Sequence, residues 1–115
     1  MIQLLFHIMG DYVTQNNWMA QKKVLFTNEG WIACWIHAFV YSLPFMFIAP
    51  SYQSWLVIFL THFFIDKFRL AKYWIKLVNY GYYSDSPIWL STWILIIVDN
   101  FFHITINYLS LTYLL

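Results

Sequence analysis

The sequence predicts an all-α membrane protein, a polytopic helical bundle of about four transmembrane helices. Hydrophobic residues make up 62% of the 115-residue chain and charged residues only 10%, which lies well outside the average of soluble domains. Aromatic residues account for 23%, against three glycines and three prolines, which favours helices bordered by Trp and Tyr belts over a loop-rich or disordered chain. At this length we expect a single domain over residues 1–115.

The N-terminal half is predicted to contain two helices. The first covers about residues 2–15 and is short for a full crossing, because a typical hydrocarbon core requires about 20 apolar residues. A polar connector follows over residues 16–30. Residues 31–49 form an apolar run without a formal charge, in which Pro44 is expected to introduce a kink. This run is the clearest predicted crossing.

The C-terminal half is predicted to contain two more helices. Residues 52–74 form a helix that is apolar in its first half and basic in its second. Residues 79–87 are rich in turn formers, and Ser86 followed by Pro87 is typical of a helix start. The last helix is therefore expected over residues 88–115.

The basic residues predict the orientation of the chain. They all follow the first or the third predicted helix, whereas the turn between the second and third helices has none. The positive-inside rule therefore places both basic connectors in the cytoplasm and both termini on the other side. The formal net charge of +1 gives no sign of nucleic-acid binding. The expected partners are the lipid bilayer, because of the apolar composition, and further copies of the chain in a homo-oligomer. The six basic residues are Lys22, Lys23, Lys67, Arg69, Lys72 and Lys76.

Four histidines and three aspartates lie inside otherwise apolar stretches, and six of these seven residues form pairs that are four positions apart. Positions i and i+4 share one face of a helix, so each pair can present two ligands together. Ionisable groups in membrane segments are costly to bury and therefore indicate a functional site. The pairs are His7 with Asp11, His62 with Asp66, and Asp99 with His103, and the seventh residue is His37.

These seven side chains predict a site for one or two divalent metal ions. A catalytic zinc ion takes about three protein ligands plus water, and imidazole and carboxylate are common ligands. Zinc is the first choice, with manganese and iron open, because the donors are mixed nitrogen and oxygen. The single cysteine, Cys34, excludes a disulfide framework or a thiolate cluster within one chain. Interhelical hydrogen bonding and a relay for protons or ions are the competing interpretations.

The chemistry predicted for this site is hydrolysis at the cytoplasmic interface. A metal ion lowers the pKa of its bound water, which can then attack a phosphoester or an amide. Asp66 or Asp99, whichever is not a ligand, is expected to act as the general base. Lys67 and Arg69 are candidates for holding an anionic substrate, and Gln15 completes the predicted substrate-binding set as a partner for a carboxylate.

Five ordered blocks of the sequence resemble those of the domain of unknown function 3307 (DUF3307) family, small membrane proteins of bacteria and their phages. The resemblance covers nearly the whole chain, with a departure at Asn100, where the family commonly has Gln. It implies a four-helix membrane domain with a metal site in the bacterial inner membrane, and the pattern is also similar to membrane proteins labelled metal-dependent hydrolases. The blocks are His7-Ile-Met-Gly-Asp11-Tyr-Val-Thr-Gln15, Trp18-Met-Ala with Lys22, His37, His62-x-x-x-Asp66-Lys67, and Asp99-Asn-x-x-His103.

Two functions of other classes remain open beside a hydrolase. A small oligomeric transporter or channel for protons or metal ions would use the same residues as a pathway across the bilayer, whereas an enzyme would gather them around one point. A non-catalytic phage membrane interaction protein would use the polar cluster only to fix its fold.

Overall fold

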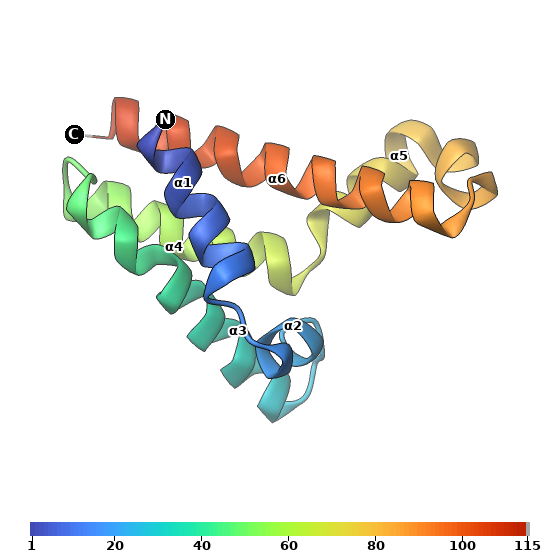
Figure 1. Cartoon of the computed structure of the whole chain (residues 1–115), viewed down its shortest axis with the longest axis horizontal. Coiled ribbons are helices and arrows are strands. Elements are labelled where there is room, and N and C mark those ends of the chain that lie inside the picture. The colour runs from blue at the N-terminus through green and yellow to red at the C-terminus, as the bar shows by residue number, and fades with distance from the viewer. Residues whose placement is uncertain (115) are drawn as a thin grey trace.

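The computed structural model describes residues 1–114, together with their side chains except at residues 79–85. Within this range every regular element is helical, so the predicted all-α class is confirmed (Figure 1). In chain order the elements are α1 (Ile2–Ile8), the π-helix η1 (Met9–Val13), α2 (Asn17–Lys22), α3 (Asn28–Ser42), the 3-10 helix η2 (Leu43–Phe47), α4 (Tyr52–Lys67), α5 (Leu70–Asp85) and α6 (Ile88–Tyr113).

The helices α3, α4 and α6 form the frame of the molecule, and α1 packs across it against α6 (Figure 1). Ala33, Cys34 and Ala38 of α3 are fully buried. Because their side chains are small, α4 can pack closely against α3. Phe63 of α4 packs against Cys34 and Ala38. The cysteine is free and buried, so it serves as a small core residue.

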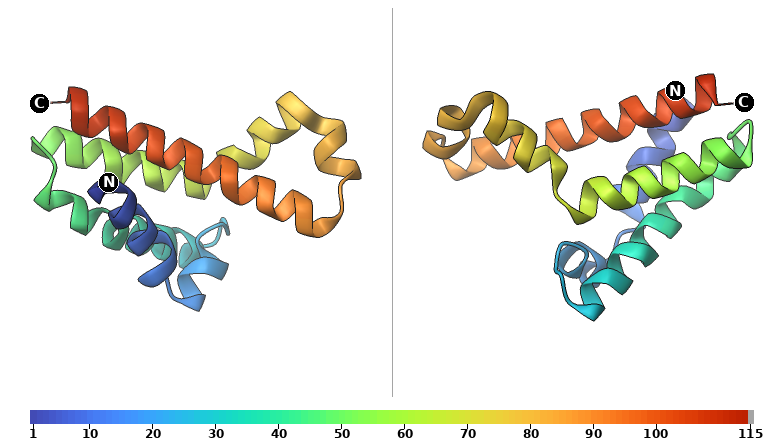
Figure 2. Two further views of the ribbon diagram at one scale, coloured as in Figure 1. Left: turned by 45° about the horizontal axis from the view of Figure 1, so that its top comes forward. Right: turned by 180° about the vertical axis from the view of Figure 1, so that it is seen from behind.

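The N-terminus, the turn between α3 and α4, and the end of α6 lie at one end of the molecule (Figures 1 and 2). Ser51 caps the start of α4, since its hydroxyl oxygen accepts a hydrogen bond from the backbone N–H of Ser54. The same hydroxyl donates to the carbonyl of Leu114 at 3.0 Å, and the hydroxyl of Ser54 donates to the carbonyl of Ser110 at 2.9 Å. These bonds fasten the start of α4 to the end of α6.

The helix predicted over residues 52–74 is divided in two. α4 ends at Lys67, and Arg69 has a φ of 50°, a left-handed conformation that non-glycine residues seldom adopt. The buried ammonium group of Lys67 donates hydrogen bonds to the carbonyl groups of Lys23 and Leu25, which holds the end of α4 against the connector before α3. The chain then turns, and α5 packs against the first half of α6 (Figure 2).

Other boundaries differ from the predicted ones by smaller amounts. The first helix ends in the π turn η1 at Val13 rather than at residue 15. The kink expected at Pro44 takes the form of η2, which follows α3 and brings the chain to the turn before α4. α5 continues to Asp85 through most of the segment predicted as a turn, and α6 begins at Ile88 as predicted.

Two helical segments are long and apolar enough to cross a membrane, namely Asn28–Phe47 and Ile88–Tyr113. α4 has 16 residues, and α1 with η1 is shorter still, whereas a crossing requires about 20. Four full crossings are therefore not confirmed for the described part of the chain.

Polar side chains lie inside the molecule and many large apolar side chains lie outside. The four histidines are at most 2% exposed. In contrast, Phe39 on α3 and Trp93 and Phe101 on α6 are each more than 45% exposed. In an ordinary soluble domain, ionisable side chains are mostly exposed and large apolar side chains are mostly buried. An exterior with this many large apolar side chains indicates a surface that contacts lipid or another protein.

Candidate metal centre

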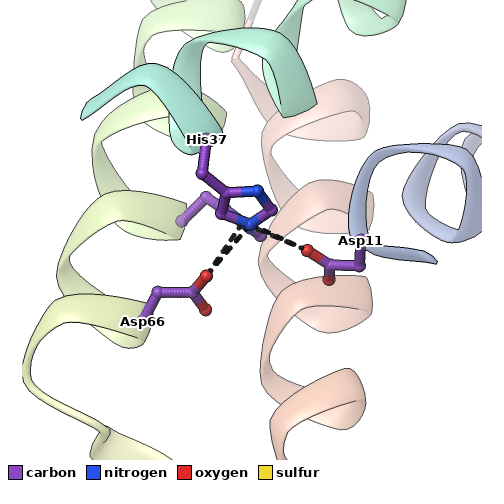
Figure 3. A group of neighbouring side chains, drawn as sticks. Asp11, His37 and Asp66 are labelled. Atoms are coloured by element: carbon purple, nitrogen blue, oxygen red, sulfur yellow. Dashed lines mark hydrogen bonds and ion pairs between the residues drawn. The ribbon is translucent and has the colours of Figure 1, made fainter. Parts of the chain in front are cut away.

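Four side chains from three different elements meet at one buried point. His37 comes from α3, Asp66 from α4, and Asp11 from η1 (Figure 3). The fourth side chain, His62, also belongs to α4. The Nε2 atoms of His37 and His62 are 3.0 Å apart. His37 Nε2 lies 3.2 Å from Asp11 Oδ1 and 3.2 Å from Asp66 Oδ2, and His62 Nε2 lies 3.3 Å from the same two oxygens. The four atoms therefore form a compact cluster of two nitrogens and two oxygens.

The shape of this cluster fits a tetrahedral divalent ion. Zinc binds nitrogen and oxygen ligands at about 2.0–2.1 Å, which requires about 3.3–3.4 Å between neighbouring ligands of a regular tetrahedron. The five separations measured between 3.0 and 3.3 Å are close to this value. In addition, Asp11 Oδ1 is buried and has no hydrogen-bond partner among the described residues, although a buried carboxylate oxygen is costly without one. A cation at the centre of the cluster would satisfy it.

His103 of α6 contacts two of these ligands from the outside. Its Nδ1 lies 3.1 Å from His62 Nδ1, and its Nε2 lies 3.1 Å from Asp66 Oδ1. If His62 binds an ion through Nε2, its proton is on Nδ1 and is donated to His103, whose own Nε2–H is donated to Asp66. This assignment satisfies every nitrogen of the two rings, so His103 can orient both ligands as outer partners of metal sites do.

His7 of α1 is held apart from the ligand cluster by two hydrogen bonds. Its Nδ1 lies 2.8 Å from the hydroxyl of Tyr41 and its Nε2 lies 2.6 Å from Asn100 Oδ1. The amide of Asn107 also donates to the Tyr41 hydroxyl, at 2.6 Å. His7 is 3.5 Å from Asp11 Oδ2 and therefore adjoins the cluster as a neighbour of one ligand.

A second group of possible ligands shares Asp11 with the first. It consists of Asp11, Asp99 and His103, whose ligand atoms lie within 4.8 Å of one another. Asp99 Oδ2 is 3.4 Å from His103 Nε2, and the Asp99 side chain is 35% exposed. Both ring nitrogens of His103 are already engaged by His62 and Asp66, so this group is a less complete ligand set than the first, and Asp99 is left with an exposed carboxylate beside it.

Lys23, in the connector after α2, contacts the cluster from the open side. Its ammonium group donates a hydrogen bond to Asp66 Oδ2 at 2.7 Å and lies 3.3 Å from His37 Nε2. Burial lowers the pKa of Lys23, but the neighbouring Asp66 and Asp11 carboxylates outweigh burial and raise that pKa above its ordinary value. The side chain therefore carries a positive charge beside the ligand set.

The π turn η1 determines where Asp11 lies. The backbone N–H of Thr14 bonds to the carbonyl of Met9 at 2.9 Å, five residues earlier, as in a π-helix. The amide of Gln15 donates to the Asp11 carbonyl at 3.1 Å, and so the predicted substrate-binding residue Gln15 lies at the end of this turn and supports its backbone. Such π turns frequently occur at functional sites.

A cavity of about 290 Å³ opens beside Asp66 and Asp99. Lys23, Arg69 and Lys72 also line it, so three cations face the acidic edge of the site. Of the two cations predicted to bind an anion, Arg69 lines the cavity. The other, Lys67, is bonded to the connector carbonyls and lies 4.3 Å from the centre of the Trp31 ring, which gives it a role in packing.

The structure adds residues to the site that could hardly be identified from the sequence. Tyr41 and Asn107 are buried polar side chains within apolar helices, the same signal that identified the histidines, and they hold His7. Asn100, noted only as a departure from the family pattern, bonds to His7 and to the Tyr12 hydroxyl. The contact of Lys23 with the site could not be predicted from the sequence, because a lysine in a polar connector is ordinarily exposed to solvent.

Gly10 allows η1 to approach α3 closely enough to bring Asp11 to His37. A Cβ atom at Gly10 would overlap the ring of Tyr41 and come within 3.1 Å of its Cα. In a position with space, alanine would stabilise a helix by about 0.5–1 kcal/mol relative to glycine. We expect Gly10→Ala to destabilise the protein instead, by about 1–3 kcal/mol, as overpacking does.

Denaturant unfolding in detergent, with metal content measured on the same samples, checks this expectation. Val13→Ala is the control, because Val13 lies in the same π turn and is 73% exposed. It should change the unfolding free energy by no more than about 0.5 kcal/mol. A Gly10→Ala protein as stable as the wild type would show that η1 does not rest against Tyr41.

Comparison with known proteins identifies one family. The family model described as protein of unknown function (DUF3307) matches residues 1–114. No curated protein and no solved structure matches the chain.

Proposed function

The chain belongs to this DUF3307 family of unknown function, and we propose that it is a membrane-embedded, metal-dependent hydrolase that acts on a phosphoester at the cytoplasmic interface. The observation that carries the proposal is the tetrahedral spacing of His37, His62, Asp11 and Asp66 next to a cavity lined by cations. Ligands that cluster at one place favour a reaction centre. A transporter would instead require polar residues distributed along a pathway across the bilayer.

The membrane location is supported by the apolar exterior and by the two helical segments of sufficient length. We propose that α3 and α6 span the bacterial inner membrane, with the shorter α4 packed between them and the short α1 packed against α6. Both termini would then lie on the side away from the cytoplasm. Lys23 follows α2 and Lys72 lies near the start of α5, and both elements lie away from the end of the molecule that holds the termini. The positive-inside rule expects basic residues on this cytoplasmic side.

A divalent ion, with zinc as first choice, would be held by the two histidines and by one or both aspartates of the cluster, since a catalytic ion needs a position left for water, and it would supply Lewis-acid activation of water and of a phosphoryl oxygen. Asp66 belongs to this ligand set, which leaves Asp99 as the general base. Asp99 is partly exposed and lines the cavity, so it can accept a proton from an attacking water. Lys23 can neutralise negative charge that develops on the substrate.

The test is hydrolysis of p-nitrophenyl phosphate by purified protein in detergent, with zinc, manganese or iron(II) added after chelation. We expect turnover that depends on the added ion. Asp99→Asn should lower kcat by about 10²–10⁴-fold with the metal retained, since general-base catalysis contributes a factor of this size. Protein that binds metal but hydrolyses neither this ester nor a phosphodiester or amide reporter would contradict the proposal.

A further inference from the structure

An apolar groove adjoins the cationic cavity beside the metal centre. Its volume is about 400 Å³, and it runs between α5 and α6. Ile65 lines both hollows, so the groove and the cavity are neighbours. The other main lining residues are Leu70, Trp74 and Leu77 of α5 and Phe102 and Ile106 of α6.

The cavity lining carries a net positive charge, because its three basic residues outnumber its two carboxylates, Asp66 and Asp99. Lys23 is paired with Asp66, whereas no acidic side chain among the described residues pairs with Arg69 or Lys72. Arg69 adopts its left-handed conformation at the break between α4 and α5, and this break places Arg69 and Lys72 at the same cavity. Non-glycine residues seldom adopt this conformation, and those that do cluster at functional sites.

The groove is open to the outside of the molecule as well as to the cavity. Leu77 is 80% exposed and Trp74 is 50% exposed, so an acyl chain could enter from the surrounding lipid. A soluble phosphate compound would gain nothing from such a surface, whereas burying each CH₂ group of a chain gains about 0.8 kcal/mol. The cationic cavity can bind an anionic head group, and the apolar groove beside it can bind a hydrocarbon chain. Together they are complementary to an anionic amphiphile.

We propose that the substrate is a phospholipid with a terminal phosphate monoester, such as phosphatidic acid. Its phosphate binds at Arg69 and Lys72 next to the metal centre, and its acyl chain lies in the groove between α5 and α6. Two unpaired cations match the two negative charges of a phosphate monoester. This inference rests on the proposed hydrolase function and names its substrate class.

The reaction is a balanced hydrolysis. Water attacks the phosphorus atom, the bond between phosphorus and the lipid oxygen breaks, and inorganic phosphate and a lipid alcohol are formed. The proton that Asp99 takes from the water is returned to the leaving lipid oxygen. No oxidant, reductant or further reactant is needed.

The test is equilibrium binding of radiolabelled phosphatidic acid, phosphatidylcholine and glycerol phosphate to the purified full chain in detergent micelles. We expect phosphatidic acid to bind at least about 10-fold more tightly than either of the others, because phosphatidylcholine lacks the second phosphate charge and glycerol phosphate lacks the acyl chains. Equal binding of glycerol phosphate would overturn the role of the groove. Equal binding of phosphatidylcholine would overturn the role of the cations.

Two pairs of matched variants locate the site. Lys72→Gln should weaken binding of phosphatidic acid about 10-fold, whereas Lys76→Gln, the same change one turn along α5 and outside the cavity, should not. Leu77→Gln should weaken it as well, whereas Val78→Gln, at an exposed neighbouring position outside the groove, should not. Equal effects within either pair would overturn the proposed position of the lipid.

Metal analysis of the same samples separates this inference from the proposed function. Protein that retains metal but shows no preference for phosphatidic acid would overturn the substrate class alone. Protein that binds phosphatidic acid selectively but holds no metal would support the lipid site and count against the hydrolase.

Discussion

Replacing His62 with glutamine is expected to remove nearly all bound metal from the purified protein. His62 Nε2 lies within 3.3 Å of the other three ligand atoms, and glutamine has no imidazole nitrogen to take its place. Loss of an outer partner of a metal ligand costs about 10–100-fold in affinity, so loss of a ligand should cost more than about 100-fold. Elemental analysis after gel filtration in detergent measures the retained ion.

His7→Gln is the matched control for this experiment. The same change is made at a histidine of the same sequence pattern, but both ring nitrogens of His7 are bonded to Tyr41 and Asn100. We expect this variant to retain metal with a loss of about 10–100-fold or less. If His7→Gln lost metal as completely as His62→Gln, the sequence-based assignment of His7 as a ligand would be favoured over the arrangement described here.

Removing the metal from the wild-type protein is expected to lower its thermal stability substantially. Without a cation, the Asp11 and Asp66 carboxylates face each other in a buried site with Lys23 as the neighbouring positive charge. A ligand that binds only the folded state stabilises it by about 4 kcal/mol when present at 1,000 times its dissociation constant. Thermal unfolding before and after chelation, and after zinc is restored, measures this difference.

The His62→Gln variant serves as the control for stability. Having lost the site, it should unfold at the same temperature with and without chelator, while the wild type recovers when zinc is added back. A wild-type midpoint unaffected by chelation, in protein that demonstrably held metal, would show that the ion does not contribute to folding. The cluster would then be held by its hydrogen bonds alone.

The sequence was informative about the candidate ligands because they lie in apolar surroundings. An imidazole or carboxylate among leucines and phenylalanines must find a partner, so His37, His62, Asp11 and Asp66 could be proposed together without coordinates. The spacing of four residues within the three His–Asp pairs was less informative. In the His7–Asp11 pair, the π turn presents Asp11 to the ligand cluster while His7 bonds to Tyr41 and Asn100.

The break after α4 could not be predicted from the residues around it. The segment from Phe64 to Trp74 contains no proline or glycine, and its residues are compatible with a continuous helix. The helix ends at Lys67 because its ammonium group finds the carbonyl groups of the distant connector. That contact joins positions more than 40 residues apart, and a local pattern carries no information about it.

By itself, the sequence determined that this protein is helical and rich in apolar residues, and that the histidines and aspartates within its apolar runs need polar partners. These properties follow from composition and from the cost of burying a charge, which act on each residue separately. Only the tertiary structure decided that His37, His62, Asp11 and Asp66 form the tetrahedral cluster, and that Lys23 lies beside it. Coordination depends on distances of a few ångströms between segments far apart in the chain, and packing of the helices alone sets those distances.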